Sequence, residues 1–281
     1  MTIEDRTLRS IANASGFLFQ LRVEREILQS SAGHNWQILS REHRWVDQFS
    51  NKEGFIDLVI ASSAGRMVVE CKRTQDASWV FLVPTGTTPV SSWDKFLWTH
   101  QQMSCRNLSS WGEFSLSPEA PISQFCVVRG QGENDSPMLE RLSGVLLRSL
   151  EYLAAEEIEI AASVTRPVYR IYLPVIVTNA TLHTLRIDSS QISLSSGTID
   201  ESMGTFEEVP FVKFRKNLSS SYKRPGSISG LTQANIEYDR TVLVVNSEHF
   251  AAMLPNTRIQ RKDDFTDWPW DNARELEQRR P

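Results

Sequence analysis

The segment Gly54–Arg73, GFIDLVIASSAGRMVVECKR, constrains the fold of this chain more than any other part of it. Two apolar runs, Phe55–Ala61 and Met67–Arg73, flank the short polar loop Ser62–Gly65. Paired strand-like runs around a Gly-containing loop of this size are typical of an antiparallel β-hairpin. The segment therefore predicts two neighbouring strands of a sheet, and each of them is unusual in carrying charge within an apolar run.

The register of this hairpin brings charged side chains together. If the loop spans four residues, Ala61 pairs with Arg66, and Asp57 then lies opposite Glu70. Directly opposed side chains have Cβ atoms about 5 Å apart, and like charges there are destabilising. With Lys72 on the face of Glu70, the hairpin favours a hard divalent cation, Mg²⁺ or Mn²⁺. The alternative is an ion pair between Lys72 and either acid at a solvated sheet edge.

A second acidic position lies on a helix that precedes the hairpin. The segment Gly16–Gln29 is rich in helix-forming residues, and Glu24 points within about 20° of the centre of its apolar face, whereas Glu26 points away. A carboxylate on a buried face is costly unless it meets a cation. Glu24 is therefore either a further ligand of the metal or the partner of Arg41 or Arg44 in an ion pair.

The remaining pattern alternates between helical and strand-like stretches, with no internal repeat and no long linker. It predicts a mixed α/β class. We expect helices over Ser92–Asn107 and Met138–Glu157, strands over Pro121–Arg129, Tyr169–Thr178, Phe211–Phe214 and Thr241–Val245, and a short helix around Phe250.

Charge and motif content exclude several classes of protein. With 30 basic and 34 acidic side chains the net charge is −4, so bulk charge would not attract a polyanion, and contact with one requires local patches. The sequence contains no GxxxxGK[ST] phosphate loop, no HExxH and no GxSxG motif. It has no apolar run of membrane-spanning length, and its three widely spaced Cys fit no disulfide framework. We therefore expect a soluble cytoplasmic protein that does not bind membranes.

One acid-free segment, Phe211–Gly226, supplies a candidate surface for nucleic acid. Its sequence, FVKFRKNLSSSYKRPG, interleaves aromatic and basic residues. This composition favours contact with a phosphate backbone, although a solvated charge run is an equal alternative. The candidate residues are Lys213, Arg215, Lys216, Lys223 and Arg224.

The order of helix, extended segment, Asp-bearing strand, tight turn, Glu-x-Lys strand and further helix resembles the PD-(D/E)XK nuclease superfamily. Asp57 matches the Asp of the motif, Glu70 its second acid and Lys72 its lysine, and Glu24 matches the acid often found on the first helix. The matched segment covers about a third of the chain. The sequence departs from the motif in having Phe55-Ile56, and no Pro, before the Asp.

This resemblance implies a restriction-endonuclease-like core, a central mixed sheet flanked by helices, within residues 1–185. Residues 186–281 would form a C-terminal extension of strands and loops, with a Trp-containing tail, packed on the core as one compact unit. In the active site Asp57, Glu70 and the main-chain carbonyl of Cys71 would hold Mg²⁺, with Glu24 beside them. Gln101 or Gln102 would supply a glutamine from the following helix, and Gln101 is favoured.

The implied activity is metal-assisted hydrolysis of phosphodiester bonds in DNA, with double-stranded DNA as the expected substrate. The opening GFLFQ of the first helix also resembles the nuclease domains of bacterial anti-phage effectors. That likeness implies protein partners that supply sensing or ATPase functions, and activation by a partner or by homo-oligomerisation. Two alternatives remain open: a non-cleaving scaffold or nucleic-acid-binding subunit on the same fold, and an RNase.

Overall fold

The computed structural model describes residues 3–47, 51–74, 78–85, 93–101, 108–128, 137–161, 168–200, 202–218 and 237–262. It confirms the α/β class: two sheets are combined with four helices in these residues. The helices are α1 (Ile3–Ala14), α2 (Phe17–Gln29), α3 (Met138–Ala161) and α5 (Ser247–Met253).

The larger sheet is mixed and ten-stranded. Its main path runs in the order β1 (Gln37–Asp47), β2 (Lys52–Ser62), β3 (Gly65–Lys72), β9 (Val168–Thr178), β13 (Asp239–Asn246), β12 (Phe211–Asn217) and β7 (Ile122–Ser123). A branch from β9 carries β5 (Asp94–Gln101), β6 (Leu108–Ser117) and β14 (Arg258–Arg261). The smaller sheet has the order β11 (Thr205–Glu208), β10 (Thr181–Asp188), β4 (Ser78–Thr85) and β8 (Phe125–Val128).

The hairpin forms with the predicted register. Ala61 pairs with Arg66, and the ladder continues to Ser62 and Gly65. The connection is therefore tighter than the expected four-residue loop, and Ser63 in it adopts a φ of 31°. β3 is not an edge strand, because β9 pairs with its other side in parallel. The alternative of an ion pair at a solvated sheet edge therefore does not apply to this strand.

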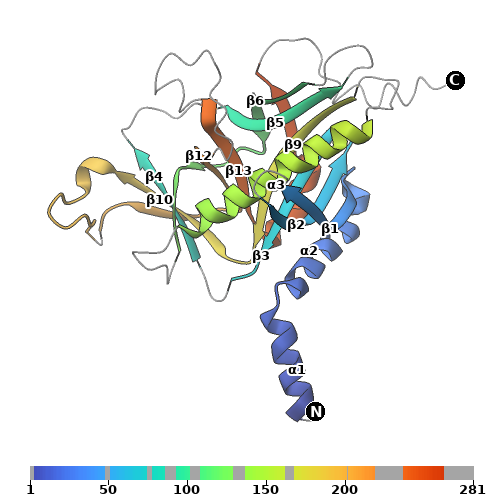
Figure 1. Ribbon diagram of the computed structural model, residues 1–281. Coiled ribbons are helices and arrows are strands. Elements are labelled where there is room, and N and C mark those ends of the chain that lie inside the picture. Colours follow the sequence, from blue (N-terminus) through green and yellow to red (C-terminus); the bar gives the residue numbers. More distant parts are fainter. Residues whose placement is uncertain are drawn as a thin grey trace.

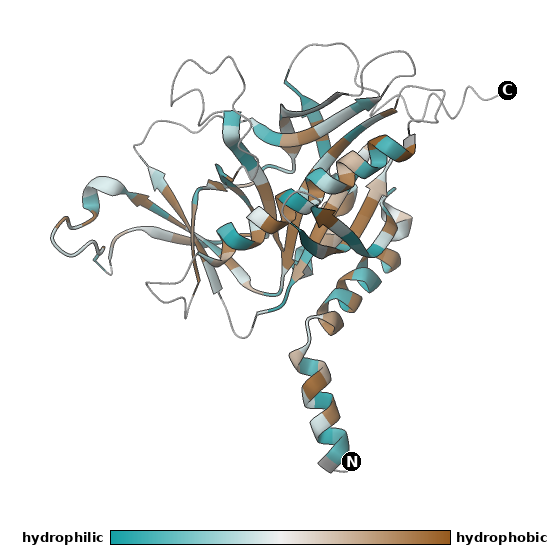
Figure 2. Ribbon diagram, viewed as in Figure 1, coloured by the Kyte–Doolittle hydropathy of each residue, from teal (hydrophilic) through white to brown (hydrophobic). Residues whose placement is uncertain are grey.

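Apolar side chains bury both faces of the larger sheet. On one face α3 packs against Val59, Val68 and Ile176, and on the other α2 and α5 pack against Leu58 and Val69. Figure 1 shows α3 crossing the sheet and α2 on the side of β1 and β2, and Figure 2 shows the apolar character of the central strands. A sheet covered by helices on both faces explains the long apolar runs in its central strands.

Helix α1 extends away from the rest of the described structure (Figure 1). Its side chains are exposed, including the apolar Leu8 and Ile11. α1 meets the body at its C-terminal end, where the guanidinium of Arg73 donates to the main-chain oxygen of Asn13. The sequence pattern did not predict this helix.

The expected helix over Ser92–Asn107 was wrong where the structure describes it. Residues 94–101 form β5, which pairs antiparallel with β6 and β9. Leu97 lies opposite Tyr172 of β9, and Phe96 is buried. Asp94, at the start of this segment, is buried in an ion pair with Lys213. Tertiary pairing outweighs the local preference for a helix here.

The expected boundary after residue 185 falls inside β10. β12 and β13, which lie beyond it, belong to the larger sheet, and β13 pairs directly with β9. The described residues therefore form no separate C-terminal domain. The expected strand over Pro121–Arg129 is divided into β7 and β8, and the Trp-containing tail lies outside the described residues. No helix in the described part is long and apolar enough to cross a membrane.

Candidate active site

The candidate site lies where β2 and β3 separate. The two strands pair from Ser62 and Gly65 as far as Leu58 and Val69. Beyond that point β2 continues along β1, and β3 continues along β9. Asp57 and Glu70 are the first residues past the last pair, so the separating strands hold both carboxylates at a fork in the sheet.

A hydrogen bond fixes Asp57 inside this fork. The main-chain N–H of Cys71 donates to Oδ2 of Asp57 at 2.6 Å. Side chains along β2 alternate between the two faces of the sheet, and this alternation changes phase at Asp57. Ile56 and Val59 both pack on the α3 side of the sheet, whereas Leu58 packs on the α2 side. The change of phase lets the Asp57 side chain lie between the strands.

The backbone of Cys71 contributes to the same fork. In an extended strand the N–H and C=O of one residue point toward the same neighbouring strand. Because the N–H of Cys71 meets Asp57, its carbonyl oxygen faces the fork as well. The thiol of Cys71 is buried in the core, and burial raises its pKa well above the usual range.

Two further residues, Glu42 and Gln20, reach the site and were missed by the sequence analysis. Glu42 lies in β1 between the partners of Leu58 and Ile56, and therefore opposite Asp57. Its φ of 47° belongs to the left-handed region. From α2, Nε2 of Gln20 donates to Oε1 of Glu42 at 2.5 Å and to the main-chain oxygen of Asp57 at 3.1 Å.

Burial and mutual repulsion perturb the two central carboxyls. Burial raises the pKa of Asp57 to about 6, with Glu42 adding to the rise, while the bond from Cys71 and the charge of Lys72 oppose it. Burial, followed by the charge of Asp57, raises the pKa of Glu70 to about 7. The ionised pair is therefore costly in the folded protein, and a bound cation would relieve that cost.

These shifts predict how stability depends on pH in EDTA. The folded pKa values of about 6 and 7 lie above the ordinary values of 3.8 and 4.5, so the folded state binds protons more tightly. Stability from these groups is complete below about pH 4 and is lost as pH rises through 6 to 7. We expect a loss of about 2 kcal/mol, since both groups are partly exposed.

Urea unfolding of the wild type and of Asp57→Asn/Glu70→Gln between pH 4.5 and 8 measures this loss. The double variant should lose less stability over that range, and 10 mM Mg²⁺ at pH 7.5 should stabilise only the wild type. Parallel pH curves for the two proteins would show that the two carboxyls are not perturbed.

Lys72, at the end of β3, is the charged side chain that follows Asp57 and Glu70 at the fork. It is half-buried, and in the described part of the chain no ion pair joins it to Asp57 or Glu70. Its charge nevertheless lowers the pKa of both carboxyls. A half-buried ammonium beside two carboxyls, without a direct ion pair, remains able to contact a ligand.

Glu24 lies one helical turn from Gln20 on α2. Of the two roles expected for it, the structure shows the ion pair with Arg41. Its Oε1 accepts from Nη2 of Arg41 at 2.6 Å, with side-chain exposures of 15% for Glu24 and 51% for Arg41. The carboxylate already has a cationic partner, whereas its predicted role was to ligate a metal. Gln20, not Glu24, is the residue of α2 that contacts the main chain of Asp57.

We therefore expect Glu24→Gln to leave both the melting temperature and any cleavage rate close to those of the wild type. The pair is largely solvent-screened on the Arg41 side, and such pairs contribute little. Thermal denaturation, with a nuclease assay beside it, measures both effects. A loss of cleavage greater than tenfold, with an unchanged melting temperature, would restore Glu24 to the metal site.

The structure does not bring Gln101 to this site. Gln101 pairs with Val168 at the start of β9, whereas Lys72 pairs with Thr178 at its end. Ten residues of extended chain separate the two positions, about 33 Å. The prediction of a catalytic role for Gln101 was wrong, because it assumed a helix directly after β3. Gln102 lies outside the described residues.

The predicted basic surface is also largely internal where it is described. Lys213 and Arg215 are only 5% and 2% exposed. Nζ of Lys213 lies 2.7 Å from Oδ2 of Asp94, and Arg215 pairs with Asp239 at 3.4 Å. Both belong to β12, inside the sheet, so the expected phosphate contact of these two residues was wrong.

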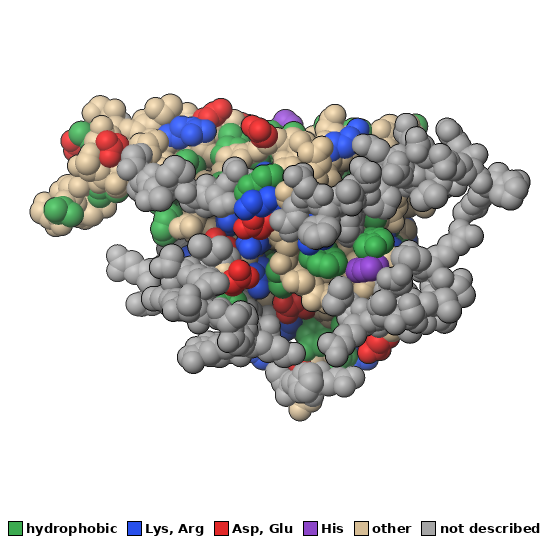
Figure 3. Space-filling model, turned by 90° about the horizontal axis from the view of Figure 1, so that it is seen from above, with side chains coloured by type: hydrophobic (Ala, Val, Ile, Leu, Met, Phe, Trp, Pro, Cys, Tyr) green, Lys and Arg blue, Asp and Glu red, His purple; other side chains and the backbone are tan. Residues whose placement is uncertain are grey.

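Lys216 is more accessible but already has an acidic partner, Glu140, at 2.6 Å. Lys223 and Arg224 lie outside the described residues. On the face shown in Figure 3, Lys and Arg side chains lie among Asp and Glu side chains and do not gather into one basic patch within the described surface.

The atoms that could ligate a metal at the fork suit a hard divalent ion. Asp57, Glu70 and the Cys71 carbonyl offer oxygen ligands only, as Mg²⁺ prefers. Among the described residues no three His, Cys, Asp or Glu side chains are close enough together to hold a metal by themselves. A site for Mg²⁺ here would have two carboxylates, one carbonyl and water or substrate, which is the usual situation for this ion.

Comparisons of the chain with protein-family models, with curated proteins and with solved structures gave no match.

Proposed function

We propose that the protein is a Mg²⁺-dependent endonuclease that hydrolyses phosphodiester bonds in DNA. The observation that carries the proposal is the fork of β2 and β3, which gathers Asp57, Glu70, Lys72 and the carbonyl of Cys71. Two carboxyls with raised pKa and an adjacent ammonium are expensive to place together in a folded protein. Such concentrations of perturbed groups are characteristic of functional sites.

The order of elements around the fork supports a restriction-endonuclease-like core. α2 is followed by the antiparallel strands β1, β2 and β3, and then α3 leads to β9, which is parallel to β3. The crossover helix is α3, whereas the sequence-based interpretation placed it at Ser92. Strands β4 to β8 are inserted between β3 and α3.

The residues at the fork have different roles in the proposed reaction. Asp57, Glu70 and the carbonyl of Cys71 would hold Mg²⁺, and the bound ion would supply Lewis-acid chemistry for hydrolysis of the phosphodiester. Lys72 orients the attacking water and stabilises the negative charge that develops on the phosphate. Gln20 and Glu42 position the backbone of Asp57 through the bonds described above.

We further propose that the chain acts as the effector subunit of a bacterial anti-phage complex, with partner proteins that sense infection or hydrolyse ATP. The resemblance of its first helix motivates this proposal. The net charge of −4, and the mixture of basic and acidic side chains on the described face that Figure 3 shows, agree with a nuclease that is quiescent alone and is activated by a partner or by self-association.

A non-cleaving scaffold or nucleic-acid-binding subunit is the second candidate, and one observation favours the scaffold. Lys213 and Arg215, two of the five bases expected to contact DNA, are used in internal ion pairs. An RNase on the same fold is the third candidate.

Incubation of the purified protein with plasmid DNA, linear DNA and RNA in Mg²⁺, Mn²⁺ or EDTA separates the three candidates. The endonuclease proposal expects metal-dependent cuts in closed circular DNA, alone or after addition of a partner complex. RNA cleavage without DNA cleavage would favour the RNase. Binding without cleavage under every metal and partner condition would favour the scaffold.

A further inference from the structure

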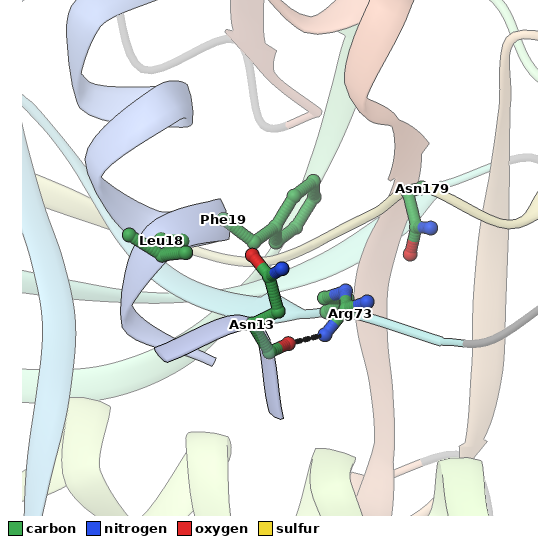
Figure 4. A pocket seen from close by; sticks show the side chains of 5 residues that line it. All are labelled: Asn13, Leu18, Phe19, Arg73 and Asn179. Atoms are coloured by element: carbon green, nitrogen blue, oxygen red, sulfur yellow. Dashed lines mark hydrogen bonds between the residues drawn. The ribbon is translucent and has the colours of Figure 1, made fainter. Parts of the chain in front are cut away.

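An open cavity of about 220 Å³ lies at the end of β3, where Lys72 of the candidate active site is followed by Arg73. It is lined by the end of α1, the first turn of α2, the end of β3 and the turn after β9 (Figure 4). Small-molecule pockets usually measure about 300–1,000 Å³, so this cavity is sized for a fragment of a ligand. Its lining residues are Asn13, Leu18, Phe19, Arg73 and Asn179.

The cavity and the candidate active site are lined by neighbouring residues of the same two elements, α2 and the end of β3. Phe19 lines the cavity, and its neighbour Gln20 contacts the main chain of Asp57. Likewise Arg73 lines the cavity, and its neighbour Lys72 belongs to the active site. Consecutive side chains of a strand leave it on opposite sides, so Lys72 and Arg73 flank the end of β3, and a ligand that crosses this end can contact both.

Arg73 supplies a cation that no acid neutralises in the described structure. Its guanidinium donates to the main-chain oxygen of Asn13, a neutral acceptor (Figure 4). A guanidinium has five N–H donors, so donors remain for an anion. The rest of its surroundings are also suited to an anion, because α2 begins at Gly16 without a side-chain cap and its first turn borders the cavity.

Asn179 holds the end of β3 in place. Its Oδ1 accepts from the main-chain N–H of Thr74 at 2.7 Å, and its Nδ2 donates to the main-chain oxygen of Thr74 at 2.9 Å. These bonds fix the residue that follows Arg73. The backbone next to Arg73 is therefore ordered before a ligand binds, which lowers the entropic cost of binding.

We propose that this cavity binds the phosphate next to the scissile one on the same DNA strand, with Arg73 as its ligand. The inference rests on the proposed nuclease function and assigns a substrate subsite to it. A DNA strand that crosses the end of β3 would present one phosphate to Lys72 and the next to Arg73 on the other side of this end. Phe19 and Leu18 form an apolar wall for the adjoining sugar or base.

The experiment measures binding of a 20-base-pair duplex by fluorescence anisotropy in EDTA across a series of salt concentrations. Loss of one phosphate contact reduces the slope of log K against log [salt] by about 0.9, and we expect that reduction for Arg73→Ala. Arg73→Lys should retain the slope with weaker binding. Arg25→Ala, on the exposed side of α2, is the matched control and should bind as the wild type does.

A scan of the duplex with single neutral methylphosphonates locates the contact. At one position the substitution should weaken binding by the wild type several-fold and leave Arg73→Ala unaffected, because the variant has already lost that contact. Melting temperatures of all variants verify the fold.

An unchanged salt slope for Arg73→Ala, with no position in the scan that distinguishes it from the wild type, would overturn the inference. Arg73 would then serve only to hold α1, and the nuclease proposal would stand if the wild type cleaves DNA. A wild type that binds no DNA under any condition would overturn both proposals.

Discussion

Lys72→Ala should reduce Mg²⁺-dependent DNA cleavage by about 10²–10³-fold, the usual loss when one group that stabilises transition-state charge is removed. Lys72 lies past the last β2–β3 pair, beside two carboxyls, and its side chain makes no ion pair there in the described structure. Its ammonium is therefore available to a ligand, and it adds no ion pair to the stability of the fold. Glu70→Gln should cause a comparable loss, because it removes the charge of a proposed metal ligand.

Single-turnover cleavage of a fluorescent duplex, with melting temperatures beside it, measures this effect. Lys52→Ala is the matched control, since Lys52 is an exposed lysine at the start of β2 and away from the fork. It should cleave at the wild-type rate. Cleavage by Lys72→Ala or Glu70→Gln at that same rate would show that the activity resides elsewhere in the molecule.

Lys213→Ala should destabilise the fold by about 3–5 kcal/mol, which is the usual cost of removing one partner from a buried ion pair. Asp94 has an exposure of 0%, and Nζ of Lys213 also donates to the main-chain oxygen of Leu116 at 3.3 Å. Burial already raises the pKa of Asp94, and the charge of Lys213 opposes that rise. Without Lys213 the buried carboxyl loses its principal counter-charge.

Urea denaturation at pH 7.5 measures this loss. The double variant Lys213→Met/Asp94→Leu should recover most of it, because apolar residues of similar volume replace both charges. The salt dependence of DNA binding by the folded double variant should equal that of the wild type. A stable Lys213→Ala with a reduced salt slope would return Lys213 to the nucleic-acid surface.

The hairpin could be predicted from sequence because its determinants are local. Two apolar runs and a short Gly-containing loop set the pairing of Ala61 with Arg66, and the pairing sets the positions of Asp57 and Glu70. The burial of the Cys71 thiol followed from simple alternation along β3.

The other parts of the site depend on contacts between distant segments. Glu42 reaches the fork through a positive φ in β1 and a hydrogen bond from α2, neither of which a periodic pattern reveals. Lys213 and Arg215 alternate with Phe214 in a strand, a pattern that indicates one apolar and one exposed face, whereas both faces of β12 are buried. Whether a charge in such a strand meets solvent or a buried acid depends on its neighbours, which for Lys213 include a residue more than 100 positions away.

The insertion of β4 to β8 also affects the order in which the site forms. The two carboxylates belong to one hairpin, whereas Glu70 pairs with Ile176 of β9, about 100 residues further along the chain. Closing so long a loop costs conformational entropy, and contacts of high sequence separation form slowly. During synthesis the hairpin therefore emerges long before β9 can cover the other side of β3. The strands that carry Asp57 and Glu70 are therefore synthesised early, whereas the backbone of Lys72 is held in place only after β9 has paired with β3.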